Sequence, residues 1–380
     1  MRGNITRRGK TSWRIKVDVG SDTSGKRLMR YLTVRGTKAT AEKELTKLLG
    51  TIHDGSYVEP VNTTVGEFVR RRIDQWEAAG TISARTAARY RQLLEHQIAP
   101  HIGKKPLQKL RPLDFEEWHT TLRQHGRVRG KGGLAARTIG HAHKVVSKAL
   151  TDAARNDLIG RNAATLEQPP TVPEQEMVIV RDVAALLEKL QGCALHVPAL
   201  LGLLCGMRLG EVLALRWSRI DLESKVIQVR EAMEQTKAHG IRFKAAKTRA
   251  GRRDISMPDS AVEAVRVYRR RQLELRMQLG VGRLPDDALL FTDLDGKPRS
   301  LSAVSRAWAD FAQRIGMPDV TFHGLRHSHA SQLIDAGVDI VTISRRLGHA
   351  KPDITLRIYA HLFQKDDSKA AAAINAVLKS

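Results

Sequence analysis

The stretch LGHAKPDITLRIYAHLF, residues 347–363, places Tyr359 between His349 and His361. A free phenol has a pKa of about 10, so only about one molecule in a thousand is the nucleophilic phenolate at neutral pH. A tyrosine that packs on a terminal helix would explain this stretch equally well. A chemical role for Tyr359 therefore requires other residues that activate it and bind its target.

The segment LLCGMRLGEVLALRW, residues 203–217, carries Arg208 and Glu211 within an otherwise apolar run. Residues three apart share one face of a helix, and Arg and Glu are seldom buried unless they are paired. The pair can be a structural ion pair. It can equally be a guanidinium aimed at a phosphate and oriented by Glu211, because the planar fork of arginine donates two parallel hydrogen bonds to phosphate oxygens.

The segment TFHGLRHSHASQLI, residues 321–334, presents His323 and Arg326 three residues apart, on one helical face. His323 and His327 are four apart, a spacing also found in metal sites. No acidic residue or cysteine nearby completes such a ligand set, which disfavours a metal. His327 and His329 can also be structural histidines that are hydrogen-bonded in the core.

A fourth segment, FKAAKTRAGRRDI at residues 243–255, places Lys247 where one predicted strand turns into the next. A lysine at a hairpin tip can reach into a neighbouring groove. Lysine-rich hairpins are also common on any basic surface, so this segment is informative only together with the others.

The net charge of the chain indicates a polyanionic partner. Lys and Arg total 64 against 40 for Asp and Glu, a formal charge of +24. Nucleic acid is the first candidate for such a partner. A membrane surface is disfavoured, because the basic residues are spread along the chain and no strongly apolar amphipathic stripe accompanies them.

Cysteine content and hydropathy predict a cytoplasmic protein. Cys193 and Cys205 are the only cysteines and lie in an apolar helical stretch, as buried free thiols in a reducing compartment would. The first residues lack the apolar core of a signal peptide. The most apolar run, CALHVPALLGLLCGM, is shorter than the roughly 20 residues that span a bilayer.

The elements that would position these residues begin with a small α+β unit. Residues 12–34 alternate as strands around the turn GSDTSGK, and residues 37–55 predict a helix with a threonine cap. After a linker at residues 58–65, four helical patterns predict a bundle over 64–165. In the first pattern Val65, Phe68, Ile73 and Trp76 recur at near-helical spacing, and Ser83 can cap the second.

A proline-rich linker at 166–178 leads into a third, mainly helical region. The exception is residues 225–257, where KVIQVRE, GIRFKAAKT and RRDISMP predict one short antiparallel sheet. In the bundle, the long fourth helix brings basic residues close together. A solvated face and a DNA-facing helix explain this cluster about equally well in so basic a chain; its members are Arg137, His141, His143, Lys144 and Lys148.

Taken in order, the motifs R-L-G-E, K-T, H-G-L-R-H, L-G-H and Y-A-H resemble the tyrosine recombinase, or phage integrase, family over roughly residues 174–363. The match assigns Arg208 and Arg326 as the paired catalytic arginines and Tyr359 as the nucleophile. It also assigns four further positions: Lys247 as the hairpin lysine, Glu211 as the acidic residue that supports the first arginine, His323 as the start of His-x-x-Arg, and His349 as the position that is His or Trp.

The resemblance implies a mainly α fold with small β-sheets. Its parts would be an arm-type DNA-binding domain at 1–57 (a three-stranded sheet plus helix), a helical core-binding domain at 64–165, and a catalytic domain with a C-terminal tail at 174–380. It further implies DNA cleavage and rejoining through a 3′-phosphotyrosine without a metal or other cofactor. Implied partners are double-stranded DNA at core-type and arm-type sites, a homotetramer docked through the tail, and an accessory factor that bends DNA or sets direction.

Two other functions are compatible with parts of the sequence. A type IB topoisomerase uses the same Arg, Lys, Arg, His and Tyr set, but the small strand-and-helix unit and the separate bundle favour an integrase of a phage or other mobile element. A non-catalytic DNA-binding protein would use Tyr359 for packing only.

Overall fold

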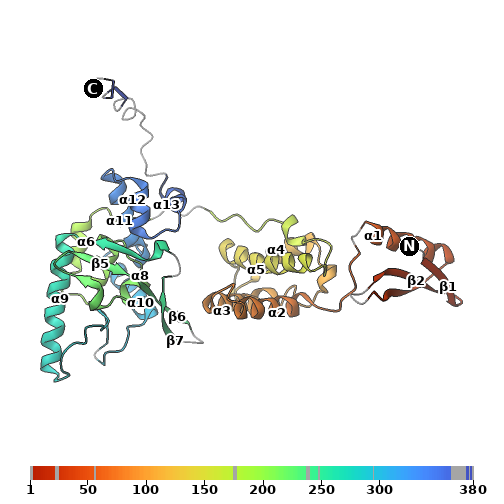
Figure 1. Ribbon diagram of the computed structural model, residues 1–380, viewed down its shortest axis with the longest axis horizontal. Helices are drawn as coiled ribbons and strands as arrows, with labels where there is room; N and C mark the ends of the chain where they lie inside the picture. Colours follow the sequence, from red (N-terminus) through yellow and green to blue (C-terminus); the bar gives the residue numbers. More distant parts are fainter. Residues whose placement is uncertain are drawn as a thin grey trace. The chain divides into compact units, whose positions relative to one another are not determined.

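The computed structural model describes residues 3–21, 25–54, 57–173, 178–236, 240–246, 249–293, 295–360, 374, 375, 377 and 378. The chain divides into two compact units, Met1–Pro173 and Glu174–Ser380. It is about half helical, with small antiparallel sheets (Figure 1), which confirms the predicted fold class. No helix in the described part of the chain is both long and apolar enough to span a membrane.

The first unit begins with an antiparallel sheet in the order β1–β2–β3, formed by Gly3–Gly9, Ser12–Ser21 and Arg27–Arg35. Helix α1, Lys38–His53, covers the face that carries the buried Ile15 and Val17. The predicted cap is present, because the Thr37 hydroxyl accepts a hydrogen bond from the Thr40 backbone N–H. The three-stranded sheet is confirmed. Its first strand, β1, carried no recognisable sequence signal.

Four helices form the bundle of the first unit: α2 (Val65–Ala78), α3 (Ala84–Leu93), α4 (Pro112–His125) and α5 (Ala136–Arg155). Ser83 caps α3, as predicted, and Thr64 caps α2. The apolar positions of the first pattern are all buried in one core. Asp152 of α5 ties that helix to α2, because its Oδ2 accepts hydrogen bonds from Trp76 Nε1 at 2.9 Å and Arg72 Nε at 3.0 Å.

The predicted linker at 58–65 is largely fixed to the bundle. The Gln108 side-chain amide donates to the Glu59 carbonyl at 2.7 Å and accepts from the Val61 N–H at 3.3 Å. The Leu107 N–H donates to the Thr63 carbonyl at 3.0 Å. Only the residues before Glu59 are left to join the N-terminal sheet and helix to the bundle.

The second unit is mainly helical, as predicted. Its helices surround one large apolar core, with a smaller cluster beside it. They are α6 (Val183–Lys189), α7 (His196–Leu204), α8 (Leu209–Leu213), α9 (Asp259–Gln278), α10 (Leu301–Arg314), α11 (Phe322–Asp335), α12 (Ile340–Leu347) and α13 (Pro352–Tyr359).

The prediction of one sheet over 225–257 was wrong. One sheet has the order β4–β5–β8, formed by Ile220–Asp221, Val226–Val229 and Arg253–Ser256. Strand β7, Gly240–Ala245, instead pairs with β6, Glu231–Thr236, in a separate two-stranded sheet. The reason is that Glu231–Thr236 is itself extended and is the nearest partner along the chain for β7.

Candidate active site

Arg208 stands at the start of α8, where both its backbone and its side chain meet Glu211. The Arg208 backbone N–H donates to Glu211 Oε2 at 2.9 Å, and Nη1 donates to Oε1 at 2.8 Å. Glu211 thus supports the helix end and orients the guanidinium. The Arg208 side chain is still 38% exposed, and its Nη2 reaches only the Gly348 carbonyl, at 3.4 Å. One edge of this guanidinium therefore remains accessible to an anion.

Glu211 has a second partner, Arg253 of β8, which the motif spacing did not suggest. Arg253 donates Nη1 to Oε1 at 3.0 Å and Nη2 to Oε2 at 2.8 Å. Burial by itself raises the pKa of Glu211, but the hydrogen bonds and charge of Arg253 and the charge of Arg208 outweigh it and bring the pKa to about 2. This carboxylate is ionised at every pH near neutrality.

Arg326 of α11 joins the segment before Arg208 to the segment before His349 through backbone carbonyls. It is 2% exposed. Its Nη1 donates to the Gly206 carbonyl at 2.6 Å, and its Nη2 donates to the Leu347 carbonyl at 2.5 Å. Burial, then the charge of Arg208, lowers its pKa to about 9. Gly206 precedes Arg208 by two residues and Leu347 precedes His349 by two, so Arg326 holds both segments at one place.

His349 follows Gly348, whose left-handed backbone ends α12 with φ of 67°. A Cβ at Gly348 would lie 2.8 Å from Arg253 Nη1 and 2.9 Å from the Ala250 carbonyl, so a glycine is required by both conformation and space. His349 Nδ1 shares a 2.6 Å hydrogen bond with the Thr355 hydroxyl. Burial, then the charges of Arg326 and Arg208, lowers the pKa of His349 to about 4, so it is neutral at pH 7.

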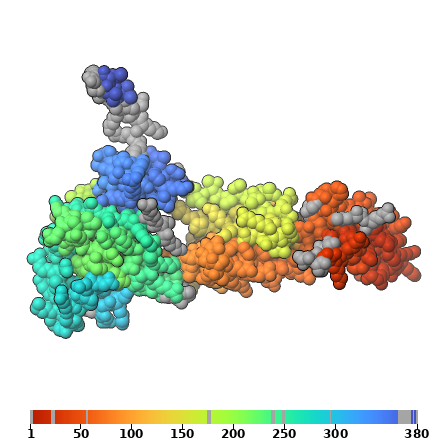
Figure 2. All heavy atoms as spheres, viewed as in Figure 1, coloured from red at the N-terminus to blue at the C-terminus, as the bar shows by residue number. Residues whose placement is uncertain are grey.

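Tyr359 is buried at the end of α13, with only 1% of its surface exposed. It packs in the smaller apolar cluster with Ile334, Ile343 and Leu347. Helices α12 and α13, shown in blue, gather on one side of this unit (Figure 2). Burial raises the pKa of the phenol to about 12, although the Arg326 charge opposes this shift. In this arrangement Tyr359 is both covered and protonated.

The hydroxyl of Tyr359 lies 2.6 Å from Nδ1 of His327. His323, the histidine singled out by the motif, instead meets the edge of the His327 ring, with centroids 4.7 Å apart. Burial, then the charges of His323 and Arg326, lowers the pKa of His327 to about 4. A neutral His327 can accept a hydrogen bond from the phenol O–H. Among the described residues no group of three or more His, Cys, Asp or Glu is placed to hold a metal ion.

Several predicted residues lie outside the part of the chain that the structure describes. Lys247 is one of them, so its contacts are not described. Most of the C-terminal tail also lies outside the described residues. Of its apolar side chains, those of Ile374, Val377 and Leu378 are described and are exposed.

The predicted basic face of the bundle is present on α5, with one exception. Arg137, His141 and Lys144 are exposed along one stripe. Lys148 is partly covered, with Nζ 4.1 Å from the centre of the Trp76 ring. The exception is His143, which is 5% exposed. It faces the bundle core, where its Nδ1 lies 3.1 Å from His119 Nε2.

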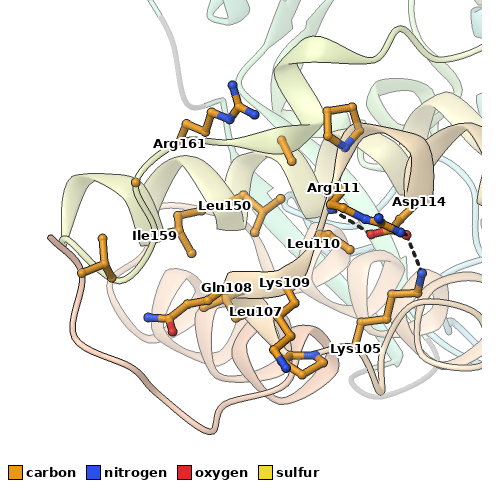
Figure 3. A pocket seen from close by; sticks show the side chains of 15 residues that line it. Lys105, Leu107, Gln108, Lys109, Leu110, Arg111, Asp114, Leu150, Ile159 and Arg161 are labelled. Atoms are coloured by element: carbon orange, nitrogen blue, oxygen red, sulfur yellow. Dashed lines mark hydrogen bonds and ion pairs between the residues drawn. The ribbon is translucent and has the colours of Figure 1, made fainter. Parts of the chain in front are cut away.

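Two hollows of about 810 Å³ each lie away from the catalytic candidates. Figure 3 shows the first, in the bundle, where Lys105 and Arg111 both pair with Asp114 and Gln108 lines the opposite end. The second lies between α7 and α9. Neither of these two hollows is lined by Arg208, Arg326, His349 or Tyr359.

Comparisons with known proteins identify the chain. The model of the phage integrase family matches residues 180–366, and that of the phage integrase N-terminal SAM-like domain matches residues 69–123. The chain is 25% identical to "Tyrosine recombinase XerC-like" of Caldanaerobacter subterraneus subsp. tengcongensis, over 98% of each chain. It is 26% identical to an integrase of Streptomyces ambofaciens, over 97% of this chain and 94% of that relative.

Solved structures show the same fold. An integrase of the Tn1549 transposon in complex with transposon right end DNA superposes with a TM-score of 0.68 at 19% identity, over 83% of this chain and 100% of that one. A lambda integrase dimer bound to a COC′ core site gives a TM-score of 0.55 at 16% identity, over 93% and 94%.

These matches and the cluster of catalytic candidates define the class of the protein: it is a tyrosine-type site-specific DNA recombinase. Within that class, the chain belongs to the phage integrase family.

Proposed function

We propose that this recombinase exchanges DNA strands through a covalent bond between Tyr359 and a DNA 3′-phosphate. The phenol oxygen attacks the scissile phosphorus, and the bond from phosphorus to the 5′ oxygen breaks. Phosphotyrosine and a free 5′-hydroxyl result. A 5′-hydroxyl from a second duplex then attacks the phosphotyrosine and releases Tyr359. The phosphotyrosine keeps the energy of the broken ester, so rejoining requires no further energy source.

The observation that carries this proposal is the meeting of Arg208, Arg326 and His349 at one place, through contacts between segments that are 140, 120 and 21 residues apart. Phosphodiester cleavage needs a barrier reduction on the order of 20 kcal/mol. Negative charge builds up on the non-bridging oxygens in the transition state. Two guanidiniums already fixed by Glu211 and by backbone carbonyls can stabilise that charge without reorganising.

Proton transfer is proposed to involve three residues. His323 is the general base named by the family motif, and Lys247 is the general acid for the leaving 5′ oxygen. His349 donates a hydrogen bond to a non-bridging oxygen. The contact between His327 and Tyr359 belongs to the buried arrangement. Attack on phosphorus requires the phenol to leave its apolar cluster, since it is only 1% exposed there.

DNA contacts are proposed at two places in the first unit. The exposed stripe with Arg137, His141 and Lys144, together with Lys148, would bind core-site phosphates. The N-terminal sheet would bind arm-type sites through its face opposite α1, where the Arg14 guanidinium and Lys16 ammonium lie 5.5 and 5.9 Å from the centre of the Tyr31 ring. A protein that acts on its host's DNA would work in the cytoplasm of a bacterial cell.

Assembly is proposed as a homotetramer on DNA, held together by the C-terminal tail. The exposed apolar side chains of Ile374 and Leu378 support a docking role for the tail. An accessory protein that bends DNA or sets direction would act on this assembly.

The nucleophile is tested with Tyr359→Phe on a nicked suicide substrate, from which the cleaved fragment diffuses away and traps the adduct. The unchanged chain should form a covalent protein–DNA band on a denaturing gel. The variant should form none, while its DNA affinity stays within about twofold. A covalent band from the Phe variant would show that another residue is the nucleophile.

The general acid is tested with Lys247→Ala on two substrates. The variant should be slow on normal DNA and much less impaired when the 5′ leaving oxygen is replaced by sulfur, which needs no protonation. Equal impairment on both substrates would assign Lys247 a different role.

A further inference from the structure

Arg253 lies beside the catalytic candidates, although no motif includes it. It is the first residue of β8, and its side chain is 6% exposed. A guanidinium that is this buried needs a counter-charge and hydrogen-bond acceptors. Arg253 has both, because it pairs with the two oxygens of Glu211 and its Nε donates to the Arg346 carbonyl at 2.7 Å.

The two arginines divide the Glu211 carboxylate between them. Arg253 contacts both oxygens through its paired Nη atoms. Arg208 takes one oxygen through its side chain and the other through its backbone N–H. With Arg253 in place, Glu211 cannot form the two-pronged pair with Arg208 that isolated Arg–carboxylate pairs adopt. The remaining N–H groups of the Arg208 guanidinium therefore make no hydrogen bond to Glu211.

Arg253 also contacts the segment that carries His349. Its Nε binds the carbonyl of Arg346, three residues before His349, and its Nη1 fills the space where a Cβ of Gly348 would stand. The positive charge of Arg253 contributes to lowering the pKa of His349 and of Arg326. Arg208 and Arg253 thus share the Glu211 carboxylate, and Arg326, which binds backbone carbonyls, adds a third positive charge, so the site is positively charged before any phosphate arrives.

We propose that Arg253 is a positioning residue for strand transfer, which occupies the Glu211 carboxylate so that Arg208 keeps a free guanidinium edge for the scissile phosphate. This inference rests on the proposed function. Without Arg253, Glu211 would be left with Arg208 as its sole cationic partner and would draw that guanidinium into a two-pronged pair. The loss would appear in the chemical step and not in DNA binding.

The test compares Arg253→Met with the unchanged chain in single-turnover cleavage of the nicked suicide substrate, with DNA affinity measured in parallel. Cleavage should slow by about 100-fold or more, the range seen when one transition-state donor is lost. Affinity should change by less than about threefold. Arg219→Met is the matched control, since Arg219 is an exposed arginine near the same sheet whose Nη1 lies 3.4 Å from Gln228 Oε1; it should cleave at the normal rate.

A second substitution separates positioning from a purely structural role. Adding Glu211→Gln to Arg253→Met removes the charge that captures Arg208. The double variant should cleave at least about tenfold faster than Arg253→Met alone. A purely structural role predicts that the two losses add, and an additive loss would overturn the proposal.

Circular dichroism checks that each variant is folded. If Arg253→Met unfolds, Arg253→Lys takes its place in the cleavage assay. A lysine reaches one carboxylate oxygen and leaves the other to Arg208, so this variant should bind DNA normally and cleave about tenfold or more slowly. Normal cleavage by Arg253→Lys would refute the inference. Absence of any adduct from the unchanged chain would instead refute the proposed function, which keeps the two failures distinct.

Discussion

The hydrogen bond between His327 and Tyr359 gives a quantitative prediction about how firmly Tyr359, the proposed nucleophile, is held in its buried position. The change is His327→Leu, which keeps most of the side-chain volume and removes the acceptor 2.6 Å from the phenol oxygen. Tyr359 is 1% exposed, so water cannot replace the lost partner without opening the cluster. A buried polar group without a partner costs about 1–3 kcal/mol. The buried arrangement of α13 should be destabilised by that amount.

Hydrogen exchange of the backbone amides in α13 measures this effect, because Tyr359 anchors the helix to the smaller apolar cluster. An opening free energy that is lower by about 1–3 kcal/mol speeds exchange by roughly 5- to 150-fold. Amides of α7, in the large core, should exchange at their normal rate and serve as the internal reference.

Tyr359→Phe supplies the matched background for the same measurement. Phenylalanine has no hydroxyl to leave unsatisfied, so His327→Leu should then alter α13 exchange by less than about threefold. Unchanged exchange in the His327→Leu single variant would refute this reasoning. An equal acceleration in both backgrounds would show that His327 acts through packing and not through the hydrogen bond.

Three further predictions concern pH dependence, cleavage and stability. Burial lowers the pKa of His329 from about 6.5 to about 4, so the unfolded chain binds the proton first as pH falls. Up to about 3 kcal/mol of the free energy of unfolding should therefore be lost between pH 6.5 and pH 4. In urea titrations, His329→Asn should lose less free energy of unfolding over the same pH range. Gly348→Ala would drive a Cβ against Arg253; cleavage should drop by more than about tenfold at unchanged DNA affinity, whereas Gly192→Ala, at a glycine with open space, should cleave normally. Asp152→Ala removes the acceptor for Trp76 and Arg72, and the bundle should lose about 3 kcal/mol in thermal unfolding. Glu116→Ala, at an exposed position of α4, is the surface control.

Local sequence patterns predicted the parts of the fold that depend on local physics. Val65, Phe68, Ile73 and Trp76 recur at helical spacing because they share one buried face, and a single α2 helix results. His323 and Arg326 both lie on α11, as their spacing of three residues predicted. Spacing within one helix determines which residues are neighbours, so both features could be predicted from the sequence.

Contacts between distant segments could not be predicted in this way. The pairing of Glu211 with Arg253 spans 42 residues, and the spacing of neither residue points to the other. A weaker signal did exist: Arg253 and Ile255 occupy the inward positions of β8, between the exposed Arg252 and Asp254. An arginine at an inward position of a strand predicts a buried partner. The predicted pairing partner of β7 was wrong for a similar reason. Alternation of apolar and polar residues identifies a strand but not the strand with which it pairs.

The attachment of residues 59–65 to the bundle sets the reach of the N-terminal sheet. Because Gln108 holds Glu59 and Val61, the tether between α1 and the bundle comprises only the residues between His53 and Glu59. Even fully extended, that tether spans about 20 Å. A body confined to a sphere of this radius has a local concentration on the order of tens of millimolar. If the sheet binds arm-type DNA as proposed, then with the bundle seated on one DNA segment the sheet would capture a second segment of modest intrinsic affinity, provided that this segment is bent to within the tether's reach.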